Sequence, residues 1–374
     1  MKPVRFLVVG GFLGAGKTTA LLRLAARFQA EGRKVGLVTN DQAANLVDTG
    51  AVRAGGFRVE EVAGACFCCK FDDLVDRAER LRALPPNERP DVLISEPVGS
   101  CTDLAATVVQ PLRRLYGDRY SLAPYSVLVD PRRARQIVLE RGFGGFSAKV
   151  AYVFQKQLEE ADLIGLNKVD LLSTKERAEL RLALGREFPR AKVIEISGLT
   201  GEGFDAWSRE LAAESVAGRN VAEVDYDVYA QGEAELGWLN LSLEVTAERS
   251  FDGAELARSL VAALRRELAG RGEVAHAKIL FETSPGSAVA SFVGAGSEIR
   301  LSGSTSVPAS RGRLVVNARV HVAPEDLKAA AERALASVLP RFGATASVVD
   351  GAHFRPARPV PVHRISAAEA AGER

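Results

Sequence analysis

The sequence predicts an α/β protein in which a doubly wound parallel sheet is followed by a smaller α+β domain. The first part of the chain alternates short apolar runs with segments of helical periodicity. A glycine-rich loop lies between the first apolar run and the first helical segment. The pattern changes after residue 232, and a chain of 374 residues usually forms more than one domain.

Short apolar runs between helices indicate a parallel sheet, because its strands are buried on both faces. The run at residues 4–9 ends at two glycines, and residues 18–29 follow with apolar side chains at helical spacing. Further strands are expected at residues 34–39, 91–95, 125–130, 163–166 and 192–197. We expect this first domain to span residues 1–213.

Residues 214–232 are mixed and polar, and we interpret them as a linker. Residues 233–353 are expected to form the α+β domain, in the order β-α-β-β-β-α-β. Its strands are expected at residues 238–246, 274–282, 288–293, 313–320 and 345–349, and its helices at 252–268 and 324–338. Residues 354–374 carry several prolines and are expected to be an extended tail on the surface.

The charge balance excludes some classes of partner. Lys and Arg total 49 and Asp and Glu total 47, a net charge of +2, which argues against coating nucleic acid or an anionic membrane. No apolar stretch approaches the roughly 18 residues of a membrane span. The N-terminal run reads as a strand and lacks the pattern of a signal peptide. Adjacent thiols in the chain suggest a reducing environment, so we expect a cytoplasmic protein.

Residues 11–19 match the phosphate-binding pattern GxxxxGK[ST] between a strand and a helix. Glycines let backbone N–H groups approach phosphate oxygens, and the helix N-terminus adds a favourable dipole. Lys17 is expected to reach the β and γ phosphates, and the Thr18 hydroxyl to bind magnesium. The alternative is a glycine-rich turn with no ligand. The expected nucleotide-binding residues of this loop are Gly11, Gly14, Ala15, Gly16, Lys17, Thr18 and Thr19.

Asn167, Lys168 and Asp170 follow the strand at residues 163–166 and suggest a base-reading loop. A carboxylate at Asp170 can accept two hydrogen bonds from guanine, whereas adenine offers no such pair of donors. Ile196, Ser197 and Gly198 follow the last strand, where a backbone N–H can meet the guanine carbonyl, and Ser197 is the residue that we assign to nucleotide binding. The pattern therefore favours GTP, although four residues alone can also be a polar turn.

Glu96 ends a strand and is expected to hold magnesium and help to place the attacking water. Gly99 can bring its N–H toward the γ phosphate. Asp41 follows another strand and offers a second acid, with an N-cap or turn as the alternative, and Asp48 is a weaker candidate. We assign Lys17, Asp41 and Glu96 to catalysis of GTP hydrolysis. Because the sequence shows no built-in arginine finger, we expect slow hydrolysis that a partner, a metal or dimerisation accelerates.

Cys66, Cys68 and Cys69 place three thiols within four residues. Such thiolates can converge on a soft or borderline cation such as zinc or copper(I), and redox chemistry is the alternative. Only three candidate ligands lie close together in the sequence, whereas a structural zinc site normally has four. We therefore expect one open coordination position, which suits transfer of the metal to another protein. Cys101 is a candidate fourth ligand, although a lone cysteine is more often a small buried apolar residue.

The four histidines lack metal spacing and are interpreted as structural. His276 and His321 fall on expected strands of the second domain, where one of them is a candidate receiving ligand.

These motifs together resemble the CobW/UreG-type metallochaperone GTPases. The resemblance rests on residues 11–19, 40–41, 66–69, 96–99 and 167–170, in that order, and covers about the first 210 residues. It implies a P-loop GTPase that binds a transition metal at its cysteine motif and delivers it to a client protein under nucleotide control. It also implies that Cys66, Cys68 and Cys69 hold the metal, while Lys17, Thr18, Asp41 and Glu96 serve nucleotide and magnesium.

Three hypotheses follow from the sequence. The first is a GTP-hydrolysing zinc-delivery protein whose client is a metalloprotein, with a nucleotide-dependent homodimer as an additional partner. The second is a GTPase assembly factor for a cobalamin-dependent enzyme. The third is a nucleotide-switched regulatory module in which the cysteines are structural or redox-active.

Overall fold

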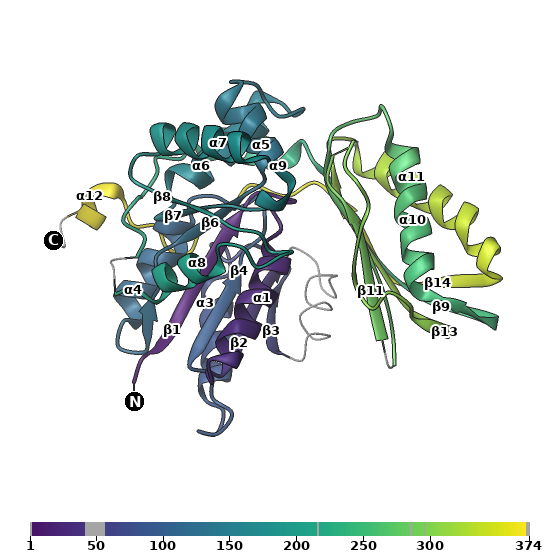
Figure 1. Ribbon diagram of the computed structural model, residues 1–374, viewed down its shortest axis with the longest axis horizontal. Coiled ribbons are helices and arrows are strands. Elements are labelled where there is room, and N and C mark those ends of the chain that lie inside the picture. The colour runs from purple at the N-terminus through teal and green to yellow at the C-terminus, as the bar shows by residue number, and fades with distance from the viewer. Residues whose placement is uncertain (1, 42–56, 215–216, 285, 295, 372–374) are drawn as a thin grey trace. The chain divides into compact units, whose positions relative to one another are not determined.

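The computed structural model describes residues 2–41, 57–214, 217–284, 286–294 and 296–371 (Figure 1). These residues form two compact units. The first contains the described residues up to Gly232 together with the tail from Arg358, and the second contains Glu233–Ala357. Within the described residues, no helix combines the length and the apolar character needed to cross a bilayer.

The first unit is built on a parallel sheet with the strand order β3-β2-β4-β1-β6-β7-β8, and β5 pairs with β1. The fold class expected from the sequence is therefore confirmed. The strands are β1 (Val4–Gly11), β2 (Val35–Asp41), β3 (Arg58–Ala63), β4 (Val92–Glu96), β5 (Tyr120–Leu122), β6 (Ser126–Val129), β7 (Leu163–Leu166) and β8 (Lys192–Glu195). Nearly all residues of β1, β4, β6 and β7 are buried, which explains why their sequences are mostly apolar.

Helices surround this sheet (Figure 1). The α-helices are α1 (Lys17–Ala30), α3 (Phe71–Arg82), α4 (Gln110–Tyr116), α5 (Pro131–Ala134), α6 (Ala148–Glu159), α7 (Thr174–Glu187), α8 (Phe204–Ala212), α9 (Tyr226–Ala234) and α12 (Ala367–Ala371). Two π-helical turns, η1 (Ala105–Val109) and η2 (Arg135–Leu139), and one 3₁₀ turn, η3 (Val169–Leu171), complete the unit. In α1 the buried face carries Leu21, Leu24 and Phe28, at the spacing of an amphipathic helix.

The second unit is an antiparallel sheet with the order β12-β11-β10-β13-β9-β14, and α10 and α11 pack on one face of it (Figure 1). Its elements are β9 (Gly237–Asp252), α10 (Gly253–Leu268), β10 (Val274–Thr283), β11 (Gly286–Phe292), β12 (Arg300–Gly303), β13 (Pro308–Val320), α11 (Pro324–Val338), η4 (Leu339–Phe342, 3₁₀) and β14 (Ala344–Phe354). Buried side chains of both helices and the covered sheet face form one core, which includes Leu256, Leu264, Ile279 and Leu327.

The structure differs from the sequence expectations at several elements. Strands β3 and β12 were not expected, because β3 carries two glutamates and β12 is only four residues long. Part of the segment interpreted as a linker forms α9. Strand β14 extends to Phe354, because its later residues pair with β9 as far as Trp238.

Candidate functional site

The phosphate loop joins β1 to α1 and has the conformation that its glycines allow. Gly11, Gly14 and Gly16 have positive φ angles of 133°, 82° and 85°, which side chains rarely tolerate. The Lys17 side chain is buried at 7% exposure, and its Nζ donates to the Gly11 carbonyl at 2.8 Å. The lysine amine thus folds back over the loop, where N–H groups at the start of α1 favour an anion.

The structure brings Thr18 and Glu96 together. Glu96 ends β4 and is 7% exposed, and its Oε1 accepts a hydrogen bond from the Thr18 hydroxyl at 3.0 Å. A hydroxyl and a carboxylate side by side are oxygen ligands of the kind that Mg²⁺ takes beside nucleotide phosphates. The residues therefore fit a magnesium ion that would neutralise phosphate charge.

Gly99 lies directly against the phosphate loop. A Cβ at this position would lie 2.9 Å from Lys17 Nζ and 2.8 Å from Leu13 Cδ2. A larger residue here would have to displace the ends of the Lys17 and Leu13 side chains, so residue 99 lies close to the amine that is expected to bind phosphate.

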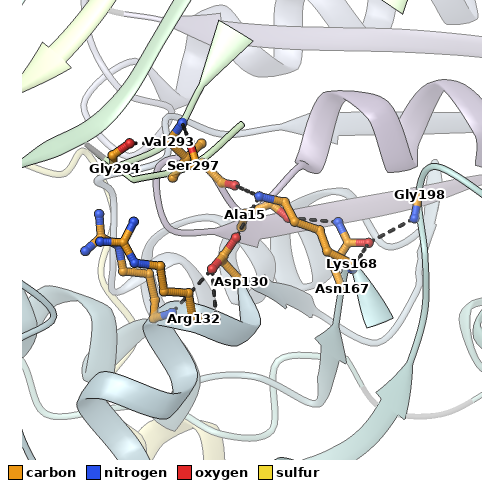
Figure 2. A network of polar contacts seen from close by, with 11 residues as sticks. Ala15, Asp130, Arg132, Asn167, Lys168, Gly198, Val293, Gly294 and Ser297 are labelled. Carbon is orange, nitrogen blue, oxygen red and sulfur yellow. Dashed lines mark hydrogen bonds and ion pairs between the residues drawn. The ribbon is translucent and has the colours of Figure 1, made fainter. Parts of the chain in front are cut away.

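The Asn167–Lys168 segment is bound to the phosphate loop (Figure 2). Asn167 donates to the Ala15 carbonyl at 2.8 Å, and Lys168 Nζ donates to the Gly14 carbonyl at 2.7 Å. Lys168 also forms an ion pair with Asp130, with Nζ and Oδ2 2.6 Å apart. Burial opposes ionisation of Asp130, but the charge and hydrogen bond of Lys168, together with the N–H and charge of Arg133, outweigh it and hold the pKa of this carboxyl below its usual value.

Asp130 was not identified as a site residue from the sequence, although its position directly after β6 and before Pro131 gave a signal. Its carboxylate also caps α5 by accepting from the N–H groups of Arg132 and Arg133. Asp130 therefore fixes Lys168 in place across the loop, which in turn fixes the start of the base-reading segment.

The structure changes the expected role of Ser197. Its backbone N–H donates to the Glu202 carbonyl at 2.9 Å, and the N–H of Gly198 donates to Asn167 at 2.9 Å. Both groups are therefore engaged within the protein. The Ser197 hydroxyl instead donates to Asp170 Oδ1 at 2.5 Å, so the serine orients the carboxylate that is expected to read the base.

The remaining acidic candidates for magnesium binding are Asp41 and Asp48. Asp41 ends β2, where its backbone is in register with Ala63, and its side chain is not among the described groups. Asp48 lies outside the described residues.

The cysteine cluster (Cys66, Cys68 and Cys69) forms a turn between β3 and α3. The Sγ atoms of Cys66 and Cys68 are 2.9 Å apart, those of Cys66 and Cys69 are 3.3 Å apart, and those of Cys68 and Cys69 are 3.8 Å apart. Backbone N–H groups of Cys69 and Lys70 both donate to the Cys66 carbonyl, which closes the turn. Cys66 and Cys68 are buried, and Cys69 is partly exposed.

Hydrogen bonds among the thiols shift the pKa values of the three cysteines in different directions. Hydrogen bonds from Cys101 first, and then from Cys68 and Cys69, lower the pKa of Cys66 well below its usual value. The hydrogen bond to Cys66 raises the pKa of Cys68, and raises that of Cys69 to about 11. Cys66 is thus the sulfur most ready to carry negative charge, and a thiolate is the form that binds metal.

Asn40 holds the cysteine turn from the neighbouring strand β2. Its amide nitrogen donates to the carbonyls of Val62 and Ala65 at 2.9 and 2.7 Å, and its oxygen accepts from the Phe67 N–H at 2.9 Å. Asn40 is only 8% exposed. The sequence pattern contained this residue, but its role became visible only in the structure.

The C-terminal tail, in yellow in Figure 1, returns to the first unit and crosses the cysteine turn. The Val360 N–H donates to Cys69 Sγ at 3.2 Å, and the Val362 N–H donates to the Cys68 carbonyl at 2.9 Å. The His363 ring contacts Phe71 edge-on, with ring centroids 5.0 Å apart. The tail therefore supplies a hydrogen bond directly to a sulfur atom of the cluster.

Asp103 anchors the next part of the tail. Its Oδ2 accepts from Arg364 Nε at 2.7 Å and from the Tyr226 hydroxyl at 2.7 Å, and the residue has a positive φ of 64°. Burial raises the pKa of Asp103 despite these hydrogen bonds. The Ile365 N–H then donates to the Ala106 carbonyl at 3.0 Å, so the tail is bound at successive residues.

A model of the nucleotide-binding domain of CobW, HypB and UreG proteins matches residues 5–195, about half of the chain. The chain belongs to the CobW/HypB/UreG family. The matched residues of this family domain include the phosphate loop, the cysteine cluster, Glu96 and residues 167–170. The tail and the second unit lie outside the match.

Curated relatives in this family include two proteins named as zinc chaperones. CobW of Pseudomonas aeruginosa is 27% identical over 218 residues, covering 51% of this chain and 56% of the relative. YjiA of Escherichia coli is 26% identical over 187 residues, covering 49% of this chain and 55% of the relative. The chain thus spans about half the length of these relatives.

Two solved structures of family members also resemble the chain. Zn(II)-bound YjiA GTPase from Escherichia coli has a TM-score of 0.38 at 18% identity, covering 90% of this chain and 99% of that one. HypB from Helicobacter pylori, in complex with nickel, has a TM-score of 0.41 at 19% identity, covering 56% of this chain and 86% of that one.

The two histidines considered as receiving ligands lie in the second unit. His276 is in β10 and is 7% exposed. His321 follows β13, and its Nε2 lies 3.6 Å from a carboxylate oxygen of Glu235. Both histidines stay candidate receiving ligands on the basis of the sequence alone.

Proposed function

We propose that this chain is a GTP-hydrolysing metallochaperone that takes up zinc at Cys66, Cys68 and Cys69 and delivers it to a client metalloprotein. The observation that carries the proposal is the convergence of these sulfur atoms, all within 4.8 Å of one another, in a nucleotide-binding domain of the CobW/HypB/UreG family. The names of the curated relatives, which describe zinc chaperones, support zinc as the cargo.

The spacing of the cysteine cluster suits zinc. Sulfur atoms on one tetrahedral zinc lie roughly 3.8 Å apart, because each Zn–S bond is about 2.3 Å long. The observed separations of 2.9–3.8 Å are close to this value, so the turn needs only a small expansion to accept the ion. Partial exposure of Cys69 leaves one sulfur atom reachable by a receiving protein.

GTP is the proposed nucleotide because Asp170 offers a carboxylate oriented by Ser197. Two hydrogen bonds from a guanine base would satisfy this carboxylate. Adenine would leave the carboxylate without a hydrogen-bond partner, and the resulting loss of binding free energy would discriminate against ATP. Asn167 and Lys168 connect the same segment to Ala15 and Gly14 of the phosphate loop. The residues proposed to bind the base and those proposed to bind the phosphates are thus connected by hydrogen bonds.

Hydrolysis requires positioning and charge neutralisation more than covalent chemistry. Lys17 would move from the Gly11 carbonyl to the phosphates, and the Thr18 and Glu96 oxygens would hold magnesium. Gly99 would present its N–H close to the terminal phosphate. We propose a slow intrinsic rate, which the client, the metal or dimerisation increases.

The test compares the wild type with the double variant Cys66→Ala, Cys68→Ala under reducing conditions. Zinc affinity is measured by competition with a chromophoric chelator, and nucleotide affinity with a fluorescent GTP analogue. The double variant should lose tight zinc binding and keep GTP binding. In the wild type, GTP with magnesium should change zinc affinity, and zinc should change GTP affinity by the same factor.

Full retention of zinc by the double variant would refute the metal site. Equal zinc affinity with and without nucleotide would refute nucleotide-controlled delivery. Reduced wild-type protein that binds no metal but forms a disulfide on mild oxidation would instead favour the regulatory alternative, in which the thiols are redox-active.

A further inference from the structure

Residues 358–365, here called the strap, precede α12 and belong to neither a helix nor a strand (Figure 1). Their backbone binds the cysteine turn at two points. The Val360 N–H donates to Cys69 Sγ at 3.2 Å, and the Val362 N–H donates to the Cys68 carbonyl at 2.9 Å. The strap is therefore attached both to a sulfur atom of the cluster and to the backbone that carries the thiols.

The prolines of the strap favour this bound state. Pro359 and Pro361 lie on either side of Val360 and have no N–H to donate, so both backbone donors of residues 359–362 are used on the cysteine turn. Proline also restricts the backbone of the free segment, which reduces the conformational entropy that is lost on binding. A displaced strap should consequently return to the same place.

The strap lies at the accessible side of the cysteine cluster. Cys66 and Cys68 are buried, whereas Cys69 is partly exposed, and the Cys69 sulfur atom is the one that accepts from Val360. A metal ion that passes to another protein leaves by way of the exposed sulfur atom, because the buried ones are surrounded by the core. The strap is thus placed between the metal site and a receiving protein.

A buried carboxylate anchors the end of the strap that leads into α12. Asp103 is 0% exposed, and its Oδ2 accepts from Arg364 Nε at 2.7 Å and from the Tyr226 hydroxyl at 2.7 Å. A carboxylate with so little access to water depends on partners of this kind, so removal of Arg364 should be costly. This anchor is the contact that has to break for the strap to leave.

The rest of the strap is held less firmly. Arg358 forms an ion pair with Asp227, with Nη2 and Oδ1 2.8 Å apart, but the two side chains are 53% and 75% exposed. Ion pairs with such access to water contribute little to stability. Val360 and Val362 are 70% and 46% exposed, so their side chains bury little apolar surface. Apart from the anchor at Arg364, a few hydrogen bonds hold the strap in place.

We propose that the strap covers the cysteine cluster of its own chain and has to be displaced before a metal ion enters or leaves. This inference rests on the proposed function, because it concerns the passage of metal at the same cysteine cluster. The bound strap shields the Cys69 sulfur atom, and the displaced strap leaves this atom open to ligand exchange. The strap thus controls the rates of metal uptake and release more than the affinity.

The experiment measures zinc uptake by the reduced full-length protein and zinc release to a chromophoric chelator, both by stopped flow. Arg364→Ala should accelerate both rates on the order of ten- to a hundredfold, because it removes a charge-assisted hydrogen bond from the buried carboxylate of Asp103. Arg364→Lys keeps the charge but not the geometry of the guanidinium, and its rates should lie between those of the wild type and the alanine variant.

Acceleration in both directions separates a displaced strap from a damaged metal site. A damaged site would release zinc faster without binding it faster, so zinc affinity would fall. A displaced strap changes both rates by a similar factor and keeps the affinity within a few-fold. Arg355→Ala is the matched control, because this arginine precedes the strap and donates to the Ala234 carbonyl. Its loss of one positive charge should leave both rates at the wild-type values.

A second variant keeps the test decisive if the loss of Arg364 unfolds the protein. Arg358→Ala removes only an exposed ion pair, so the fold should be retained, and both rates should rise about two- to fivefold. Hydrogen exchange of residues 358–365, followed by mass spectrometry, reports the strap directly. Its amides should be protected in the wild type and should exchange faster in each accelerated variant.

Wild-type rates of uptake and release in every folded strap variant, in protein that binds zinc, would overturn the inference and leave the proposed function intact. Faster release with unchanged uptake would also overturn it, because Arg364 would then only stabilise the metal site. Reduced wild-type protein that binds no zinc would overturn both the inference and the proposed function.

Discussion

The phosphate loop and the cysteine cluster are both short motifs of the first unit, but they are assembled in different ways. The phosphate loop obtains its shape from its own glycines and from the start of α1, within residues 11–18. The cysteine cluster depends on residues from distant segments: Asn40 of β2, Cys101 after β4 and Val360 of the tail. A local motif therefore sets the backbone shape of the phosphate loop, which Glu96 and Lys168 then contact from other strands, whereas tertiary structure sets the surroundings of the thiols.

This difference matters because the two ligands need different environments. Phosphate binding uses backbone N–H groups that any sequence with the right glycines can present. The reactivity of a thiolate depends on its hydrogen bonds and its burial, and these come from neighbours in space. Substitutions at distant residues should thus affect the cysteine cluster more than the phosphate loop.

The largest effect is expected from Lys17→Ala. Two charge-assisted hydrogen bonds to phosphate, at about 1.5–3 kcal/mol each, would be lost, so GTP affinity should fall roughly 10²- to 10⁴-fold. Zinc affinity without nucleotide should stay at the wild-type value, because the cysteine cluster makes no use of this amine. Isothermal titration of both ligands checks this, and a parallel loss of zinc binding would contradict the separation of the two sites.

Asn40→Ala should have the opposite selectivity to Lys17→Ala, because it should weaken zinc binding rather than GTP binding. Three hydrogen bonds to the cysteine turn would disappear, and loss of such outer contacts typically reduces metal affinity about 10- to 100-fold. Chelator competition measures this loss. An unchanged zinc affinity would show that the turn holds its shape without β2.

Gly99→Ala tests the close approach of residue 99, which follows β4, to Lys17. The added Cβ would crowd Lys17 Nζ and Leu13, and overpacking of this kind should weaken GTP binding by about 1–2 kcal/mol, roughly five- to thirtyfold. Gly185→Ala in α7 is the matched control, because its Cβ would meet nothing within 4 Å. If both variants bind GTP equally, the contact with Lys17 has no role in nucleotide binding.

The smallest effect is expected from Val360→Pro, which removes only the N–H that donates to Cys69. Prolines already flank this position and favour an extended backbone, so the tail should keep its path. Loss of one hydrogen bond, about 0.5–1.5 kcal/mol, should raise the pKa of Cys69 further and slow its alkylation two- to tenfold. Val360→Ala keeps the N–H and should react at the wild-type rate, and equal rates in both variants would mean that the bond is unimportant.

The sequence was informative where chemistry depends on neighbours along the chain. The alternating apolar runs predicted the parallel sheet, and Gly11, Gly14 and Gly16 have the positive φ angles that a phosphate-binding loop requires. The sequence also placed the three cysteines in a single turn, although their metal-binding role stays a proposal.

The sequence was not informative where a contact joins distant segments. Asp130 could be paired with Lys168 only once β6 and β7 were known to lie side by side. A backbone N–H in residues 196–198 was expected to meet the base, but the Ser197 N–H donates to the Glu202 carbonyl, in a turn whose geometry no pattern predicted. The tail was expected to lie on the surface, and the sequence contained no signal that it would reach Cys69.

The hydrogen bond between Val360 and Cys69 joins residues 291 positions apart. During synthesis on the ribosome, the cysteine turn emerges long before residues 358–365 have been translated and released. Until then, Cys69 lacks its backbone donor and the turn lacks the tail that covers it. The thiols of a nascent chain are consequently more open to oxidation and to unintended metals, and the cluster gains its final hydrogen-bond donor only after residues 358–365 have left the ribosome.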